Sequence, residues 1–307
     1  MHADAFFTIG KSHKVCQDYA VAGVTPPLPS ADFECLDKDP ATYQRAYAIV
    51  SDGCSSSPNT DFGSRFLSME ARTQFLLQAD DTGREMALRT DGLIWNADGT
   101  RRSLQLHRTC LDATLLCAFE QPNNEVEVTI MGDGVLAARD LDGRIHTWAV
   151  RFEPGESGRV APGYPSYILD CDRLDRYTLG DYQHRVVKYT IDGEFEDRYE
   201  SSIEIEGVGG VRLYDGFEWA MRLSGTDFDF IAVLTDGAEA FQRRDEHGRL
   251  ELVPLHEVLE QTMAIKGSKG EFVTRRCNRF LTKFCAKHGW EPIDDFSMAA
   301  IWCGGDK

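Results

Sequence analysis

The chain has 307 residues, of which 42% are hydrophobic and 10% aromatic, so it can bury a sizeable core. Its 33 Lys and Arg residues against 50 Asp and Glu residues give a net charge of −17 at pH 7. That charge repels nucleic acid and anionic membranes, so we expect neither as a partner. No apolar run approaches the roughly 20 residues of a membrane helix, and residues 1–10 lack a signal-peptide pattern. The predicted location is the cytoplasm.

The first half of the chain reads as short strands and one long helix. Strands are expected at residues 6–10, 18–24 and 46–50, with a loop over residues 25–40 that contains Pro and Ser. A long amphipathic helix is predicted by the helical spacing of the apolar residues Phe62, Phe66, Met69 and Leu76. Further strands are expected at residues 113–119, 126–131, 135–139 and 144–150. Their close succession predicts an antiparallel meander.

The second half begins with a segment that is rich in Tyr, Gly and charged residues, from Glu153 to Thr226. We expect it to be an elaborated, flap-like part of the fold, with strands at residues 202–206 and 210–214. After it come a strand at residues 230–234, helices at residues 255–265 and 271–288, and a strand at residues 297–303. Internal repeats and long linkers are absent, so residues 1–307 are predicted to form a single domain. Strands cluster with strands and helices with helices, which indicates an α+β class.

Four aspartates stand where apolar strands end or begin: Asp52, Asp133, Asp236 and Asp294. The strands of one sandwich bring such edges together in space. Several carboxylates cannot converge without a cation, because like charges at short range are unfavourable. Oxygen ligands without Cys or His at metal spacing favour Mg²⁺ or Mn²⁺ over Zn²⁺. A single Asp-Gly pair is usually only a turn, but four in the same strand-edge context predict a divalent metal site.

Six segments resemble, in order, the motifs of the metal-dependent protein phosphatases of type 2C, and the resemblance is closer to divergent bacterial members. The segments are Cys16-Gln17-Asp18, Ile49-Val50-Ser51-Asp52-Gly53, Asp112-Ala113-Thr114-Leu115-Leu116, Met131-Gly132-Asp133-Gly134, Val233-Leu234-Thr235-Asp236-Gly237 and Asp294-Asp295-Phe296-Ser297. The resemblance implies a four-layer α+β sandwich of two antiparallel sheets flanked by helices. It also implies hydrolysis of phosphoserine and phosphothreonine with two Mn²⁺ or Mg²⁺ ions.

Carried over by position, the resemblance implies a role for each matching residue. Asp52 would bridge two metal ions, and the carbonyl of Gly53 would bind one of them. Asp236 and Asp294 would bind the other ion. Asp18 would act through metal-bound water, and Asp133 would belong to a weaker third position.

The chain also departs from the family pattern. Gln17 replaces a Glu, and Ala240 stands where many members have an aspartate for the third ion. His13 stands where an arginine normally binds the phosphate, with Lys14 next to it as a substitute cation. Cys54 replaces the histidine that eukaryotic members use as a general acid.

The predicted activity is therefore that of a phosphoprotein phosphatase, a phosphoric monoester hydrolase whose partner is a phosphorylated protein and which opposes a Ser/Thr kinase. The chemistry needs no protein nucleophile, and the chain has no Gly-x-Ser-x-Gly elbow, Cys-x5-Arg loop or Walker sequence. Two alternatives stay open. One is a non-catalytic binding or signalling module of the same fold, and the other is a phosphatase for small phosphorylated metabolites.

Overall fold

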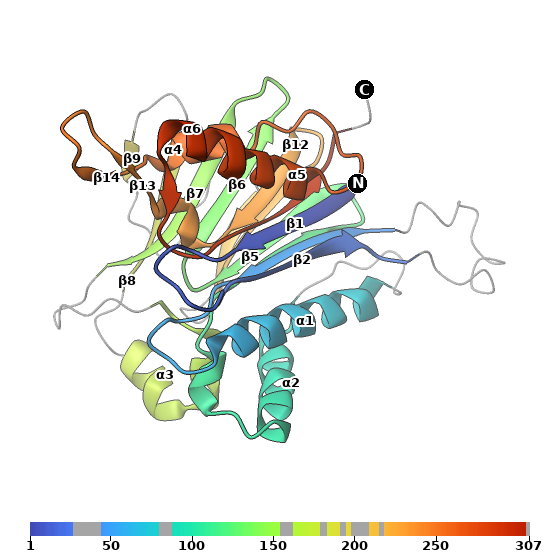
Figure 1. Ribbon diagram of the computed structural model, residues 1–307. Coiled ribbons are helices and arrows are strands. Elements are labelled where there is room, and N and C mark those ends of the chain that lie inside the picture. The colour runs from blue at the N-terminus through green and yellow to red at the C-terminus, as the bar shows by residue number, and fades with distance from the viewer. Residues whose placement is uncertain are drawn as a thin grey trace, which may run out of the picture.

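A computed structural model describes residues 1–26, 44–79, 88–153, 162–178, 183–190, 195–197, 209–214 and 218–304. Two antiparallel sheets pack face to face, and helices cover the outer face of each (Figure 1). The predicted α+β sandwich of two sheets flanked by helices is thus confirmed. The N- and C-terminal strands lie next to each other in the same sheet (Figure 1).

Sheet I has seven strands in the order β1-β16-β12-β6-β7-β8-β9. Their bounds are β1 (His2–Thr8), β16 (Phe296–Trp302), β12 (Phe228–Leu234), β6 (Gly134–Asp140), β7 (Ile145–Glu153), β8 (Gln183–Thr190) and β9 (Phe195–Asp197). Sheet II has six strands in the order β10-β11-β5-β4-β3-β2. Their bounds are β10 (Gly209–Tyr214), β11 (Glu218–Ser224), β5 (Glu125–Met131), β4 (Leu115–Glu120), β3 (Ala46–Ser51) and β2 (Tyr19–Val24). A small third sheet joins β14 (Leu250–Leu252), β13 (Phe241–Arg244) and β15 (Glu291–Pro292).

The helices form two groups on opposite sides of the sandwich (Figure 1). The sheet II group is α1 (Thr60–Ala79), α2 (Thr90–Ser103), η3 (Arg108–Leu111), η4 (Pro165–Leu169) and α3 (Cys171–Thr178). The sheet I group is α4 (Leu255–Thr262), α5 (Phe272–Arg279), η6 (Phe280–Cys285) and α6 (Ala286–His288). The predicted helix at 271–288 is thus a continuous helical run with a π-helical middle. One more short turn, η5 (Asp236–Glu239), follows β12.

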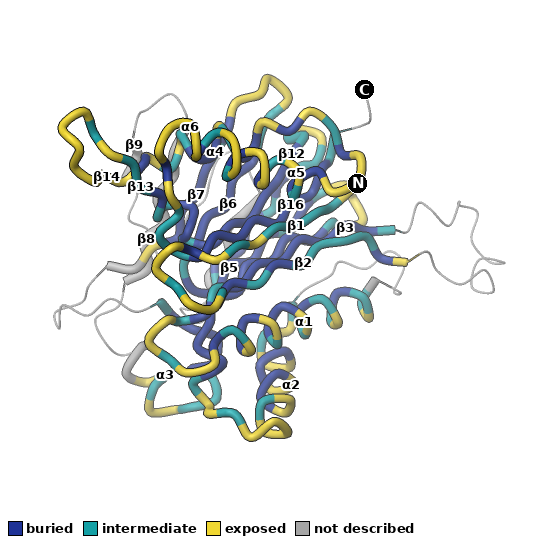
Figure 2. Tube along the Cα trace, viewed as in Figure 1, coloured by how far each residue is buried: buried dark blue, intermediate teal, exposed yellow. Residues whose placement is uncertain are grey.

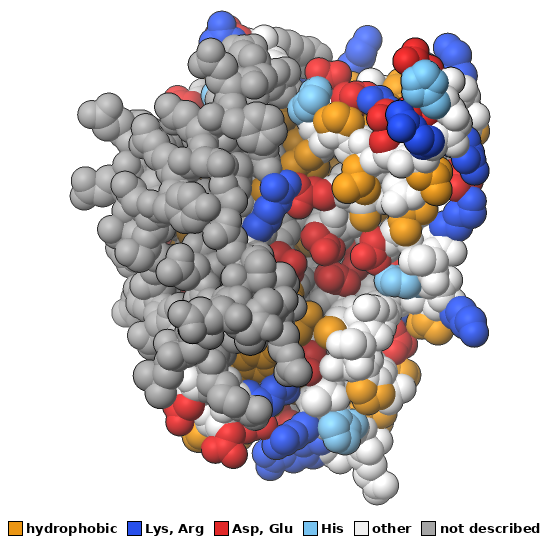
Figure 3. Space-filling model, turned by 90° about the vertical axis from the view of Figure 1, so that its left-hand side faces the viewer, with side chains coloured by type: hydrophobic (Ala, Val, Ile, Leu, Met, Phe, Trp, Pro, Cys, Tyr) orange, Lys and Arg blue, Asp and Glu red, His pale blue; other side chains and the backbone are white. Residues whose placement is uncertain are grey.

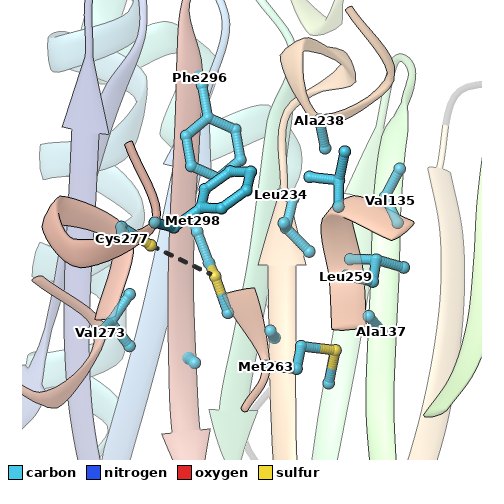
Figure 4. Close-up of a cluster of buried hydrophobic side chains, with 14 of the residues drawn as sticks. Val135, Ala137, Leu234, Ala238, Leu259, Met263, Val273, Cys277, Phe296 and Met298 are labelled. Carbon is cyan, nitrogen blue, oxygen red and sulfur yellow. Dashed lines mark hydrogen bonds between the residues drawn. The ribbon is translucent and has the colours of Figure 1, made fainter. Parts of the chain in front are cut away.

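The core consists of apolar layers between the sheets and beneath each helix group (Figure 2). The layer under α4 and α5 includes Met298 of β16, whose Sδ atom accepts a contact from Cys277 Sγ at 3.9 Å (Figure 4). The thiol is buried in this layer, and burial raises the pKa of Cys277 well above its usual value. The eight cysteines among the described residues are free thiols. No helix in the described ranges is both long and apolar enough to cross a membrane.

The predicted meander over residues 113–150 is wrong, because its four strands belong to two sheets. β4 and β5 pair in sheet II, whereas β6 and β7 pair in sheet I. The crossing occurs at Gly132 and Gly134, whose φ angles of +89° and +143° are unfavourable for residues with a Cβ. A Cβ on Gly134 would also lie 2.6 Å from Leu116 Cδ2. The turn therefore requires glycine on both sides of Asp133.

The segment from Glu153 to Thr226 adds strands to both sheets. β8 and β9 extend sheet I beyond β7, and β10 and β11 extend sheet II beyond β5. The predicted strand at 210–214 matches β10, whereas the one at 202–206 lies outside the described residues. Most of the loop predicted at 25–40 also lies outside them. The flap-like character of the segment stays a prediction.

Candidate active site

Asp52 leaves a fully buried strand at the edge where the two sheets meet. The six residues of β3 are all buried, and the next backbone groups are fixed by Thr114. The Thr114 N–H donates to the Asp52 carbonyl at 2.8 Å, and the Asp52 N–H donates to Thr114 Oγ1 at 3.1 Å. A Cβ on Gly53 would lie 2.8 Å from Thr60 Cβ, because the first residue of α1 packs against it. The Asp52-Gly53 pair thus forms a turn, and its glycine also lets the start of α1 approach closely.

Three backbone segments pack closely against one another and bring Asp236 and Asp294 together. A Cβ on Gly237 would lie 1.7 Å from the Asp295 carbonyl oxygen. A Cβ on Gly10 would lie 2.2 Å from the Asp294 carbonyl carbon. The loop after β1, the turn after β12 and the start of β16 can approach this closely only because two glycines stand at the contacts.

Asp295 fixes the loop that carries the other predicted site residues. Its side chain is fully buried and accepts the N–H of Gly10 at 2.7 Å and the N–H of Gln17 at 2.6 Å. Sequence reasoning assigned Asp294 to the metal and gave Asp295 no role. The doublet was visible in the sequence, but which carboxylate turns inward depends on the packing around it.

Asp18 is held by a network from the two neighbouring strands of sheet I. Its side chain is 1% exposed, and Thr235 Oγ1 donates to its Oδ2 atom at 2.7 Å. Thr235 in turn accepts the N–H of Ser297 at 3.1 Å. No described group donates to Asp18 Oδ1, and the side chain it contacts is another carboxyl group, that of Asp52. Two carboxyl groups can share such a contact only with a proton or a cation between them.

The electrostatics of the cluster disfavour full ionisation. Burial raises the pKa of Asp18 to about 7, with a further increase from the charge of Asp295. Burial and the charges of Glu239 and Asp294 raise the pKa of Asp133 to about 6. The pKa values of Asp52 and Asp236 lie well above the usual range, because burial adds to the charges of the other carboxylates. Figure 3 shows acidic side chains gathered in a hollow on this face of the molecule.

The two predicted phosphate-contact residues take different positions. His13 lies against the cluster, with Nδ1 3.1 Å from Asp295 Oδ2 and Nε2 3.4 Å from Asp294 Oδ1. Lys14 is exposed and forms no ion pair with the described residues. The structure therefore brings His13 to the acidic cluster and leaves the Lys14 ammonium at the surface beside it.

Cys54 lies next to the cluster and has a lowered pKa. Burial works against the thiolate, yet hydrogen bonds from Ser56 and Tyr164 hold the pKa below its usual value. The contact from Cys54 Sγ to Ser56 Oγ is 3.1 Å. The sulfur therefore has hydroxyl groups of Ser56 and Tyr164 as hydrogen-bond partners.

The donor chemistry of the cluster fits a hard divalent cation. It offers carboxylate oxygens, and the buried Oδ1 of Asp18 lacks a hydrogen-bond donor among the described groups. In the part of the chain that the structure describes, no three His, Cys, Asp or Glu side chains form a ready metal-binding group. Carboxylates must therefore turn toward one another to hold an ion. The assignment of Asp52, Gly53, Asp236, Asp294 and Asp133 as ligands stays a prediction.

Comparison with known proteins gives one family match. Residues 38–156 match the family described as Protein phosphatase 2C. The predicted resemblance to the type 2C protein phosphatases is thereby confirmed. The matched segment contains β3 with Asp52-Gly53 and the Gly132-Asp133-Gly134 crossing. Asp18, Asp236 and Asp294 lie outside it and rest on the geometry described above.

Solved structures with a similar arrangement are distant in sequence. A bacterial serine phosphatase is 10% identical, with a TM-score of 0.48 and coverage of 100% of this chain and 99% of that chain. The serine/threonine phosphatase Stp1 from Staphylococcus aureus is 9% identical, with a TM-score of 0.47 and coverage of 99% and 96%. The phosphatase domain of SpoIIE from Bacillus subtilis is 10% identical, with a TM-score of 0.41 and coverage of 98% and 93%. A search of curated proteins finds no match.

Proposed function

We propose that the protein is a cytoplasmic, metal-dependent phosphoric monoester hydrolase that removes phosphate from phosphoserine and phosphothreonine side chains of proteins and so opposes a Ser/Thr kinase. One observation supports this most: aspartates from separate strand ends meet at one edge of the sandwich and raise one another's pKa values. Such a cluster is costly unless a cation binds to it. The likeness to the type 2C phosphatases gives the same assignment.

The residues that would hold the cations are those with oxygen atoms at the cluster. Asp52, Asp236, Asp294 and the Gly53 carbonyl would hold two Mn²⁺ or Mg²⁺ ions, and Asp133 a weaker third. When bound, such ions supply Lewis acidity, which lowers the pKa of water and withdraws charge from a phosphoryl group. Asp52 and Asp236 retain some solvent exposure, so an ion can reach them from the hollow.

Asp18 is the residue best placed to hold a proton during the reaction. Its Oδ2 atom is fixed by the Thr235 hydroxyl, so Oδ1 is the oxygen that remains for a water molecule or a shared proton. Burial favours the neutral carboxylic acid, which can donate a hydrogen bond. His13 and Lys14 would supply positive charge toward the phosphate, and the His13 ring lies within 3.4 Å of two carboxylates.

The test is hydrolysis of a phosphothreonine peptide, a phosphoserine peptide and para-nitrophenyl phosphate, each with added Mn²⁺, with added Mg²⁺ and with excess EDTA. We expect turnover that depends on the metal and that Asp52→Asn abolishes, while circular dichroism shows a folded chain. Full activity in EDTA would refute the metal-dependent mechanism.

The same measurements separate the alternatives. A non-catalytic module would hydrolyse none of the three substrates at any metal concentration. A phosphatase for small metabolites would hydrolyse para-nitrophenyl phosphate and small phosphorylated metabolites faster than either phosphopeptide.

A further inference from the structure

Arg151 lies beside the acidic cluster because of the strand register in sheet I. Gly134, the first residue of β6, pairs with Val150 of β7. The β6–β7 ladder ends at that pair, with Asp133 just before Gly134 and Arg151 just after Val150 in the sequence. Asp133 and Arg151 therefore stand at the same end of the β6–β7 ladder, at the edge that carries the site.

The side chain of Arg151 forms an ion pair with Glu239. Arg151 Nε lies 3.3 Å from Glu239 Oε2, and its Nη2 atom contacts Oε1 of the same carboxylate. Glu239 closes the η5 turn that Asp236 opens, and residues three apart in a 3₁₀ turn lie on the same side. The charge of Glu239 helps to raise the pKa values of both Asp133 and Asp236. Arg151 thus contacts a residue, Glu239, whose charge acts on two of the predicted metal ligands.

Other basic side chains near the site have different surroundings, and Lys14 is exposed at the surface. His13 is held between Asp294 and Asp295, and Lys11 pairs with Glu291 in the exposed part of the loop. The side chain of Arg151 is 44% exposed and that of Glu239 is 23% exposed, so an incoming ligand can reach the guanidinium. A half-exposed ion pair of this kind is weak and can exchange partners.

We propose that Arg151 binds the phosphoryl group of the substrate, and that Glu239 occupies the guanidinium until a phosphate oxygen replaces it. The proposal rests on the phosphatase function proposed above and adds Arg151 as a phosphate-binding residue to the proposed contacts of His13 and Lys14. A guanidinium presents two parallel N–H groups that match two oxygens of a phosphate, which is the arrangement it already makes with the Glu239 carboxylate.

The experiment measures the dissociation constant of inorganic phosphate by calorimetry on the Mn²⁺-loaded protein, together with the Michaelis constant for para-nitrophenyl phosphate. Arg151→Ala should weaken phosphate binding and raise the Michaelis constant by about tenfold or more, as expected for the loss of a charge-assisted pair. Arg151→Lys should recover only part of the binding, because an ammonium cannot form the two parallel bonds. The Mn²⁺ concentration for half-maximal binding should stay within twofold of wild type.

Arg144→Ala is the matched control, since Arg144 lies exposed at the far end of the same β6–β7 hairpin. It should leave phosphate binding unchanged. Glu239→Gln should act in the opposite direction and tighten phosphate binding, because the guanidinium loses its competing carboxylate. That gain should disappear when Arg151→Ala is combined with it, which separates partner exchange from a general loss of negative charge.

Three results would overturn the proposal. The first is phosphate binding by Arg151→Ala within twofold of wild type, and the second is a gain from Glu239→Gln that persists without the arginine. The third is a wild-type protein that binds Mn²⁺ but no phosphate. A wild-type protein that binds phosphate through Arg151 but hydrolyses no phosphomonoester would instead refute the proposed function and leave the binding assignment standing.

Discussion

The carboxylate cluster should make the metal-free protein less stable at pH 8 than at pH 5.5. Asp18 has a pKa of about 7 in the folded protein against an ordinary 3.8, and the pKa values of Asp52 and Asp236 are raised too. A group whose pKa rises on folding stabilises the folded state fully below its unfolded pKa, and this contribution is lost as the pH rises through the folded pKa. For Asp18 the loss runs from about pH 4 to about pH 7.

The expected size follows from the same values. Within that interval one such group changes the free energy of unfolding by about 1.4 kcal/mol per pH unit. Between pH 5.5 and pH 7, Asp18 alone removes about 2 kcal/mol. For a chain of 307 residues, this lowers the melting temperature by about 3 °C. The assay is calorimetry in EDTA from pH 5.5 to pH 8 at constant ionic strength, and Mn²⁺ at pH 8 should restore the lost stability.

Asp52→Asn should make the metal-free protein more stable at pH 8, flatten the pH dependence and remove the response to Mn²⁺. The carboxamide has no charge and can donate an N–H toward Asp18. Asp98→Asn is the contrasting control, because the buried Asp98 lies 2.6 Å from both Arg101 Nε and Arg102 Nε. Its substitution should lower the melting temperature. A metal-free melting temperature that is constant or rises from pH 5.5 to pH 8, with no gain from Asp52→Asn, would refute this reasoning.

Two further predictions concern the residues that shape the site. Thr235→Val removes the hydroxyl that donates to Asp18, so it should lower the free energy of unfolding by about 1–3 kcal/mol and lower the turnover number. Thr235→Ser keeps a hydroxyl and should keep both values near those of the wild type. Equal kinetics for the two variants would contradict the role of the hydroxyl. Gly237→Ala should prevent stable folding, because its Cβ would lie 1.7 Å from the Asp295 carbonyl oxygen. In the control Gly99→Ala, in α2, the new Cβ meets nothing within 4 Å, and the free energy of unfolding should rise by about 0.5–1 kcal/mol. A well-folded Gly237→Ala variant with the wild-type melting temperature would show that the backbone contact is not required.

The strands that carry the motifs could be predicted from sequence because their signals are local. The segments at 46–50 and 230–234 are continuous apolar runs that stop at Asp-Gly pairs, and both are buried strands in the structure. The same feature places their aspartates at a sheet edge. The sequence therefore predicted that the carboxylates lie on the same side of the sandwich. It did not predict how their side chains converge.

What the sequence left open depends on long-range packing. The chain crosses from sheet II to sheet I at Gly132 and Gly134, and the positive φ angles of these residues cannot be read from the sequence alone. Helix α2 was missed because it contains Gly92 and Gly99 and buries little more than one narrow stripe. Arg151 gave no local signal, since its place at the same end of the β6–β7 ladder as Asp133 is a property of the strand register.

The pairing of β1 with β16 has a consequence for how the protein reaches its folded state. His2 pairs with Trp302 and Thr8 with Phe296, so residues almost 300 positions apart are neighbours along seven pairs. The contact of Gly10 and Gly237 with the residues just before β16 has the same long reach. During synthesis, β1 therefore lacks its neighbouring strand in sheet I until β16 is made. Formation of the acidic site should then be among the last and slowest steps of folding, because contacts of such high sequence separation form late.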